Sequence, residues 1–240
     1  MTDLFRGVRD KIDFRVNAKT EYQARVASKN LILDVGGQNR FSRSGRRVSA
    51  LSQKPNTSIV STDIIASYGP DIVDDICNTA ISANSCDGVY CEAVLEHVQE
   101  YWKAIDNIYS ILKTDGEAFF YVPFMFHYHD SIDHHRFTFT EVVRMLEKFS
   151  EVRIFAPGNG DGFGWVSWYV ITMTTITRFR RLHNFLSKLT DALLGLILSV
   201  LYRVKESDIQ ERYDGISLDD FRYYYTYLFM NHGFCAWARK

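Results

Sequence analysis

The sequence predicts an α/β fold: a mostly parallel, doubly wound sheet with helices on both faces. Two observations carry this prediction. Strand-like and helix-like segments alternate through the first 155 residues, which is typical of parallel sheets built from strand–helix–strand units. The strand-like segments are short, continuous apolar runs, as expected for strands buried on both faces.

The first half of the chain contains most of these elements. Trp102, Ile105 and Ile108 recur at a spacing of three residues, and Lys113-Thr114-Asp115-Gly116 ends the segment, which predicts a core-facing helix followed by a turn. In chain order we expect a helix at 18–29, strands at 31–35, 58–63, 71–73 and 88–91, a helical turn at 92–98, the helix at 101–112 and a strand at 117–122.

The second half adds an irregular region before a last strand. Thr140 is a good N-cap for a helix at 141–149, and a strand follows at 152–155. Residues 165–230 break the alternation and contain helical runs near 180–203 and 218–229. We therefore expect one domain over 1–240. Its parts are a helical segment (1–30), a core (31–156), an insertion that caps the sheet (165–230) and a final strand (232–238).

The charge of the chain argues against a nucleic-acid-binding protein. The chain has 28 Lys and Arg against 29 Asp and Glu, a net charge of −1, and its basic clusters at 40–47 and 178–181 are short. A nucleic-acid partner is not expected.

Cysteine usage and apolar runs predict where the protein acts. Cys77, Cys86, Cys91 and Cys235 lack CxxC spacing, which argues against a zinc site and a disulfide scaffold and favours the cytoplasm. The N-terminus does not resemble a signal peptide. The longest apolar run, 192–202, is about half the roughly 20 residues that a membrane span needs, so we expect no transmembrane helix.

Ligands of open parallel sheets bind at the carboxyl ends of the strands. Asp34-Val35-Gly36-Gly37 closes the first expected strand, where glycines let the backbone approach a ligand. Asp63 closes the second and could accept hydrogen bonds from ribose hydroxyls. The GxGxxG fingerprint is absent, which disfavours an NAD-linked oxidoreductase.

Several motifs, in order, resemble class I methyltransferases of the ubiquinone/menaquinone-biosynthesis-like type. They are Leu31-Ile32-Leu33-Asp34-Val35-Gly36-Gly37, then Thr62-Asp63-Ile64, Asp71-Ile72-Val73-Asp74-Asp75-Ile76, Ser85-Cys86-Asp87-Gly88-Val89-Tyr90-Cys91-Glu92-Ala93-Val94-Leu95-Glu96-His97-Val98 and Ile111-Leu112-Lys113-Thr114-Asp115-Gly116. The resemblance covers roughly residues 25–155. The link at 38–57 is longer than in most members.

This resemblance implies a seven-stranded Rossmann-like sheet and S-adenosylmethionine as cofactor. The implied cofactor residues are Asp34, Gly36 and Gly37 at the methionine part, Asp63 at the ribose, Asp75 and Ile76 at the adenine, and Cys91, Glu92 and Ala93 at the floor, with His97 nearby.

The stretch 123–138, here called the histidine loop, holds four of the seven histidines. Histidine and aspartate can take a proton from an attacking hydroxyl. We expect His127 or His129 as the general base, with His134 and His135 as alternatives. Asp130, Asp133 and Arg136 are expected at the acceptor, although Arg136 could instead form an internal salt bridge. The HxHxDH metal pattern is broken at Ser131 and Ile132, so no metal is expected.

The same stretch resembles the "PF…H…D…RFT" segment of methyltransferases associated with surface-polysaccharide and glycosyl biosynthesis. That similarity implies O-methylation of a saccharide, a glycolipid or another small molecule. Residues 192–202 and 221–229 could face a membrane or a lipid-linked substrate, although a core or homodimer contact is the commoner use of such segments. The alternative function is an inactive, cofactor-binding partner protein in a biosynthetic assembly.

Overall fold

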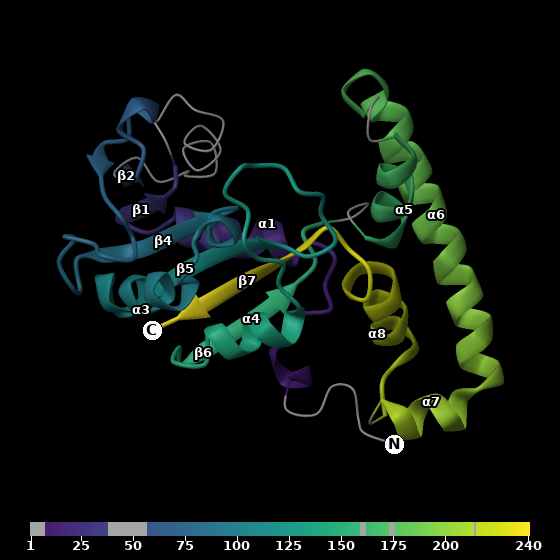
Figure 1. Ribbon diagram of the computed structural model, residues 1–240. Helices are drawn as coiled ribbons and strands as arrows, with labels where there is room; N and C mark the ends of the chain where they lie inside the picture. Colours follow the sequence, from purple (N-terminus) through teal and green to yellow (C-terminus); the bar gives the residue numbers. More distant parts are fainter. Residues whose placement is uncertain (1–7, 38–56, 159–161, 173–175, 214) are drawn as a thin grey trace.

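The computed structural model describes residues 8–37, 57–158, 162–172, 176–213 and 215–240 (Figure 1). The basic cluster at 40–47 and nearly all of the long link at 38–57 lie outside these residues. The fold and the site are therefore built from the described ranges.

Seven strands form one sheet in the order β3-β2-β1-β4-β5-β7-β6. Every neighbouring pair is parallel except those of β7, which runs antiparallel between β5 and β6. This confirms the predicted mostly parallel, Rossmann-like sheet. The strands are β1 (Leu31–Val35), β2 (Ser58–Asp63), β3 (Ile72–Val73), β4 (Cys86–Glu92), β5 (Leu112–Pro123), β6 (Glu151–Phe155) and β7 (Gly233–Arg239).

Helices cover both faces of the sheet, as predicted. On one face, α1 (Ala18–Ala27) places Tyr22 between Phe155 and Trp237, with ring centroids 4.9 and 5.2 Å apart. On the other face, α3 (Tyr101–Ile111) and α4 (Phe139–Met145) pack on the larger apolar cluster. The central strands β1, β4, β5 and β7 are therefore buried from two sides, which explains their largely apolar sequences, whereas the edge strand β3 is exposed.

Three local details differ from the predictions. The N-cap of α4 is Thr138 rather than Thr140, because the Thr138 hydroxyl accepts a hydrogen bond from the Glu141 amide at 3.3 Å. The expected turn at 113–116 lies inside β5 as an irregularity: Leu112 pairs with Cys86, and the next paired residue is Glu117. The segment at 92–98 forms only a short 3-10 turn, η3 (Leu95–His97).

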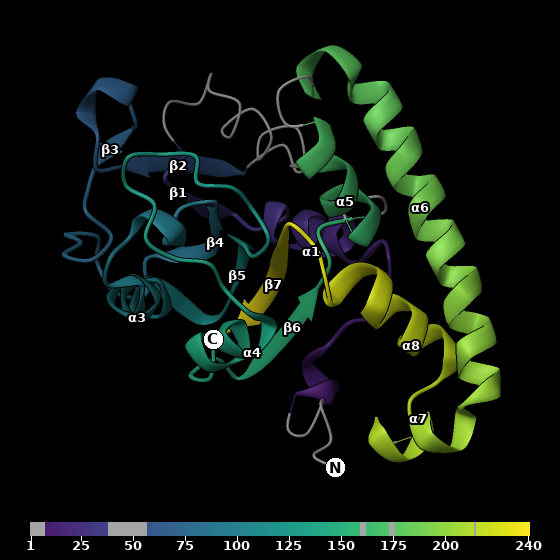
Figure 2. The same ribbon diagram turned by 45° about the vertical axis from the view of Figure 1, so that its right-hand side comes forward.

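The insertion is helical, as predicted, and precedes the final strand. It comprises α5 (Phe163–Thr172), α6 (Ile176–Val204), α7 (Glu206–Arg212), α8 (Leu218–Tyr223) and a π-helical turn, η4 (Tyr224–Leu228). Figures 1 and 2 both place α6 at the outside of the molecule, with α5 and α8 between it and the sheet.

Helix α6 is longer than the apolar run at 192–202 from which the sequence analysis expected no transmembrane helix. Residues Arg181–Val204 form a helix long and apolar enough, by length and composition, to cross a membrane, and 28% of its most apolar window is buried. The uninterrupted run at 192–202 underestimated it, because polar residues that interrupt the sequence fall on one face of a helix that continues past them.

A buried ion-pair network joins α1 to the sheet. The Glu117 side chain is 4% exposed and contacts Arg25 Nε and Lys29 Nζ, each at 2.9 Å. Trp237 Nε1 donates to the same carboxylate at 2.9 Å. Burial alone would raise the pKa of Glu117, but the hydrogen bonds from Lys29, Trp237 and Arg25 outweigh it and leave this pKa lowered.

Replacing Glu117 by Ala should lower the free energy of unfolding by about 3 kcal/mol, because the buried indole N–H and two cations would lose their partner. Since the folded pKa is lowered, the contribution is present at neutral pH and lost as the pH falls through the acidic range. Urea unfolding measures both effects. The control is Glu21→Ala, whose partner Arg15 is exposed, and which should change stability by less than about 1 kcal/mol.

Candidate active site at the carboxyl edge of the sheet

The order of strands reverses between β1 and β4. From β1 the chain continues outward to β2 and β3, and it then returns to the other side of β1 with β4. Val35 and Cys91 are register partners, so the segments that follow them leave the sheet side by side. Such a switch point is where open α/β sheets bind their ligands.

Close backbone approach requires the two glycines after β1. Gly36 has φ +67°, and a Cβ on it would lie 2.5 Å from Val94 Cγ2. A Cβ on Gly37 would lie 2.4 Å from Asp34 Oδ2. Beside them Ala93 also has positive φ, 55°, and its amide donates to Tyr121 O at 3.0 Å. The predicted residues Asp34, Gly36, Gly37 and Ala93 therefore meet at one edge.

Other predicted cofactor residues have their side chains directed elsewhere. The Cys91 side chain is fully buried in the core, and burial raises the pKa of its thiol. Ile76 is also buried in the core. Glu92 accepts a hydrogen bond from Gln23 Nε2 at 2.6 Å, which ties the end of β4 to α1. Cys91 can thus face a ligand only with its backbone.

The acids after β2 and β3 differ in what they contact. Asp63 Oδ1 accepts from the Ile65 amide at 2.9 Å. Asp75 uses one oxygen for the Cys77 amide and the other for the Asn78 side chain. Asp74 accepts from the Ala80 amide with Oδ1, whereas its buried Oδ2 has no hydrogen-bond partner. Asp74, which sequence reasoning passed over in favour of its neighbour, is therefore the better acceptor for a ligand donor.

An internal ion pair shapes the histidine loop. Arg136 contacts the Asp133 carboxylate and donates to the backbone oxygens of Phe126 and His127 at 3.0 and 2.8 Å. The Asp133 side chain is fully buried, and the hydrogen bond from Arg136 holds the pKa of Asp133 far below its usual range. Both residues, expected at the acceptor, instead hold the loop in shape.

Backbone contacts fasten this loop to η3. The amides of His134 and His135 donate to Glu96 O at 2.7 and 3.2 Å. The His135 ring also lies 3.1 Å from Gln99 O and packs edge-on against Tyr101. Asp130 is exposed and accepts from the Ser131 amide.

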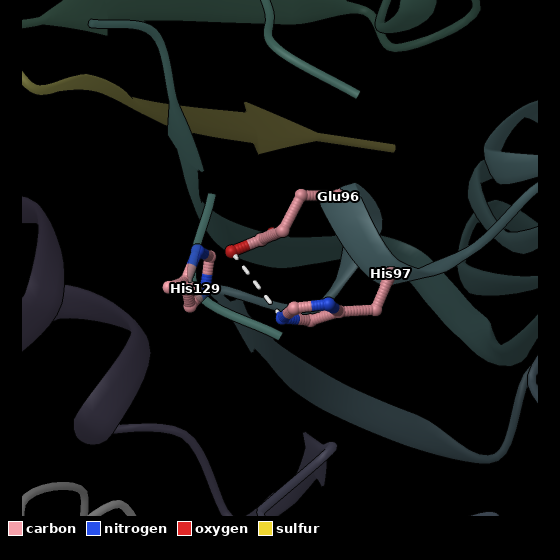
Figure 3. Close-up of side chains that lie close together, drawn as sticks. All are labelled: Glu96, His97 and His129. Atoms are coloured by element: carbon pink, nitrogen blue, oxygen red, sulfur yellow. Dashed lines mark ion pairs between the residues drawn. The ribbon is translucent and has the colours of Figure 1, made fainter. Parts of the chain in front are cut away.

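Glu96, His97 and His129 form a cluster whose ligand atoms all lie within 4.8 Å of one another (Figure 3). His97 Nε2 is 3.9 Å from Glu96 Oε1. The other ring nitrogens are held in place: His97 Nδ1 by Ile132 O, and His129 Nδ1 by Asp133 at 3.2 Å. Acceptors at Nδ1 fix the tautomer that presents Nε2.

Burial gives Glu96 unusual protonation behaviour. The residue is 1% exposed, its Oε2 has no hydrogen-bond partner, and burial raises its pKa to about 7. A buried carboxyl beside two imidazoles is a set of groups suited to proton transfer, and the same set suits a divalent cation. The sequence indicated His97 and His129 separately, and it indicated Glu96 only as part of the motif that resembles the family.

Aromatic side chains of α5 close the outer side of the histidine loop. Tyr169 OH contacts the His127 ring, and Trp165 stacks on Tyr169 with centroids 4.4 Å apart. Phe126 lies 5.8 Å from Tyr169 in a stacked arrangement. Burial and the nearby His129 lower the pKa of His127. The insertion and the loop together thus form an aromatic wall beside the cluster.

Comparisons with known proteins agree with this architecture. The family model of a methyltransferase domain matches residues 39–120. No curated protein matches the chain by sequence. The match covers 82 of the 240 residues and runs from the link before β2 into β5.

Solved structures of methyltransferases are similar to this chain at low identity. A protein from Archaeoglobus fulgidus described as a SAM-dependent methyltransferase is 14% identical, with a TM-score of 0.52 over 98% of this chain and 96% of that one. Phosphoethanolamine N-methyltransferase 2 of Haemonchus contortus, in complex with S-adenosyl-L-methionine, is 16% identical, with a TM-score of 0.50; the match covers 93% of this chain and 52% of that one. A third, 1,6-didemethyltoxoflavin-N1-methyltransferase of Burkholderia thailandensis, is 17% identical over 60% of this chain and 69% of that one, with a TM-score of 0.41.

The protonation of Glu96 should appear in the pH dependence of stability. Because its folded pKa is raised, its contribution is full below the unfolded pKa and lost as the pH rises through about 7. Glu96→Gln should therefore remove part of the fall in urea midpoint between pH 5 and pH 8. The exposed neighbour variant Glu100→Gln should keep the wild-type slope. An unchanged slope in Glu96→Gln would show that the carboxyl titrates normally.

Proposed function

We propose that this chain transfers the methyl group of S-adenosylmethionine to a hydroxyl of a saccharide, a glycolipid or another small acceptor. One observation carries the proposal. Gly36, Gly37 and Ala93 lie at the same edge of the sheet as the Glu96–His97–His129 cluster. The match to a methyltransferase domain supports it. The free thiols suit an enzyme of the reducing cytoplasm.

The residues at the switch point fit this cofactor. Asp34, Gly36 and Gly37 would hold the methionine part, and Asp63 would bind the ribose. The buried, unpartnered Oδ2 of Asp74 suits a donor such as the exocyclic amine of adenine. The sulfonium supplies an activated methyl group, so the protein's main task is to hold donor and acceptor in line.

His129 is our choice of general base. As the acceptor oxygen bonds to the methyl carbon, the carbon–sulfur bond breaks and leaves S-adenosylhomocysteine. The hydroxyl proton passes to His129 Nε2, because Nδ1 is held by Asp133. Asp133 and Glu96 would stabilise the resulting imidazolium. His134 and His135 are less suited, because their contacts to η3 fasten the loop.

The aromatic wall supports a saccharide acceptor. Phe126, Trp165 and Tyr169 present ring surfaces beside the cluster, and such faces pack well against the C–H face of a sugar ring. Because α5 supplies two of the three rings, acceptor binding would depend on the insertion.

Gly37→Ala should weaken binding of S-adenosylhomocysteine at least tenfold, because the new methyl would lie 2.4 Å from Asp34 Oδ2. Isothermal titration calorimetry measures the affinity. The control is Gly195→Ala in α6, where the nearest atom to a new Cβ, 3.1 Å away, belongs to the flexible Arg222 side chain. Equal affinity in the two variants would place the cofactor elsewhere.

His129→Ala should lower turnover roughly 100-fold or more while leaving the affinity for S-adenosylhomocysteine within about twofold. Release of S-adenosylhomocysteine from S-adenosylmethionine, with a panel of glycan and glycolipid acceptors, measures turnover. The matched control is His134→Ala, whose only described contact to η3 is made by its backbone. Cofactor binding by the wild type without methyl release on any acceptor would favour the inactive partner protein.

A further inference from the structure

The outward face of α6 is apolar along its described length. Leu182, Phe185, Leu189, Leu193, Ile197 and Val200 are between 45% and 63% exposed. They recur every three or four residues, so they form one stripe along the helix. Figure 2 shows α6 as the outermost element, so this stripe faces away from the domain. Stripes of this kind mark interaction surfaces on soluble proteins.

The inward face of the same helix carries the polar residues. His183, Ser187 and Asp191 are each at most 5% exposed and are spaced four residues apart. Asp191 Oδ1 accepts from the Gly164 amide at 2.7 Å, and Trp168 Nε1 donates to Thr190 Oγ1 at 2.8 Å. The helix therefore docks on α5 through polar contacts and leaves its apolar stripe outside.

Cations line one edge of the stripe. Arg181, Lys188 and Arg203 are exposed and are separated by seven and fifteen residues, close to whole helical turns. The only acid in Ile176–Val204 is the buried Asp191. A surface that is apolar at its centre and basic along its edge complements the acyl chains and anionic headgroups of a bilayer.

We propose that α6 is an interfacial membrane-binding helix that lies in the surface of an anionic bilayer. It would lie flat and seat the stripe among the acyl chains, because the stripe runs along one face of the helix and the opposite face packs on α5. The inference rests on α6 alone and does not depend on methyl transfer.

Two other occupants fit the surface less well. A membrane-spanning helix would have to leave α5 and carry His183, Ser187 and Asp191 into the hydrocarbon, which is costly for polar groups. An antiparallel pair of two copies would place the same basic edge of both helices side by side, where like charges repel.

Binding to vesicles tests the proposal. The full-length protein should float with vesicles of phosphatidylcholine and phosphatidylglycerol, and bind pure phosphatidylcholine at least tenfold more weakly. Ile197→Glu, which places a charge at a stripe position that is 63% exposed, should weaken binding at least tenfold. Asn184→Glu adds the same charge to an exposed position of α6 off the stripe and should bind nearly as the wild type does. Replacing Lys188 by Gln should weaken binding about fivefold, the value of one cation near an anionic surface.

Four results would overturn the inference. The first is an absence of vesicle binding by the wild type, and the second is equal binding by Ile197→Glu and Asn184→Glu. The third is a stable dimer in solution that Ile197→Glu dissociates, which would identify a second copy as the occupant. Resistance of the membrane-associated protein to alkaline carbonate extraction would likewise replace the interfacial helix with a spanning one. Circular dichroism of each variant confirms that α6 is retained.

Discussion

The parallel pairing of β1 with β4 is the constraint on which the rest of this structure depends. It places the turns after Val35 and Glu92 side by side, and both turns adopt backbone conformations that most residues avoid, at Gly36 and Ala93. A Cβ on Gly37 would lie 2.4 Å from Asp34 Oδ2, so the turn keeps this shape only because the position lacks a side chain. Strain of this kind is kept where a ligand needs close access to the backbone.

The acceptor side of the site is assembled from segments far apart in the sequence. Glu96 O receives two amides of the histidine loop, and Tyr169 of α5 contacts His127 from the other side. The Arg136–Asp133 pair fixes the shape of the loop between these two attachments. A loop held at both ends can present His129 toward Glu96 without a regular element of its own.

The insertion serves two surfaces at once. On its inner side, α5 contributes Trp165 and Tyr169 to the aromatic wall. On its outer side, α6 carries an apolar stripe bordered by cations. Because α5 and α6 are joined by buried polar contacts such as Asp191 to Gly164, a bilayer bound at the stripe and a lipid-linked acceptor at the wall would lie on opposite sides of one helical pair.

The sequence by itself determined the sheet, its helices on both faces and the helical insertion, because apolar periodicity and turn residues are local signals. It also indicated the residues expected at the methionine part of the cofactor, since Asp34, Gly36 and Gly37 lie at the end of a strand. Local patterns could not distinguish Asp74 from Asp75, because only the folded turn shows which carboxylate is already bonded. Nor could they assign Asp133 and Arg136 to each other, or join Glu96 to His129 across 32 intervening positions. The direction in which the apolar face of α6 points was likewise decided by tertiary structure, because periodicity gives a stripe but packing decides whether it is covered.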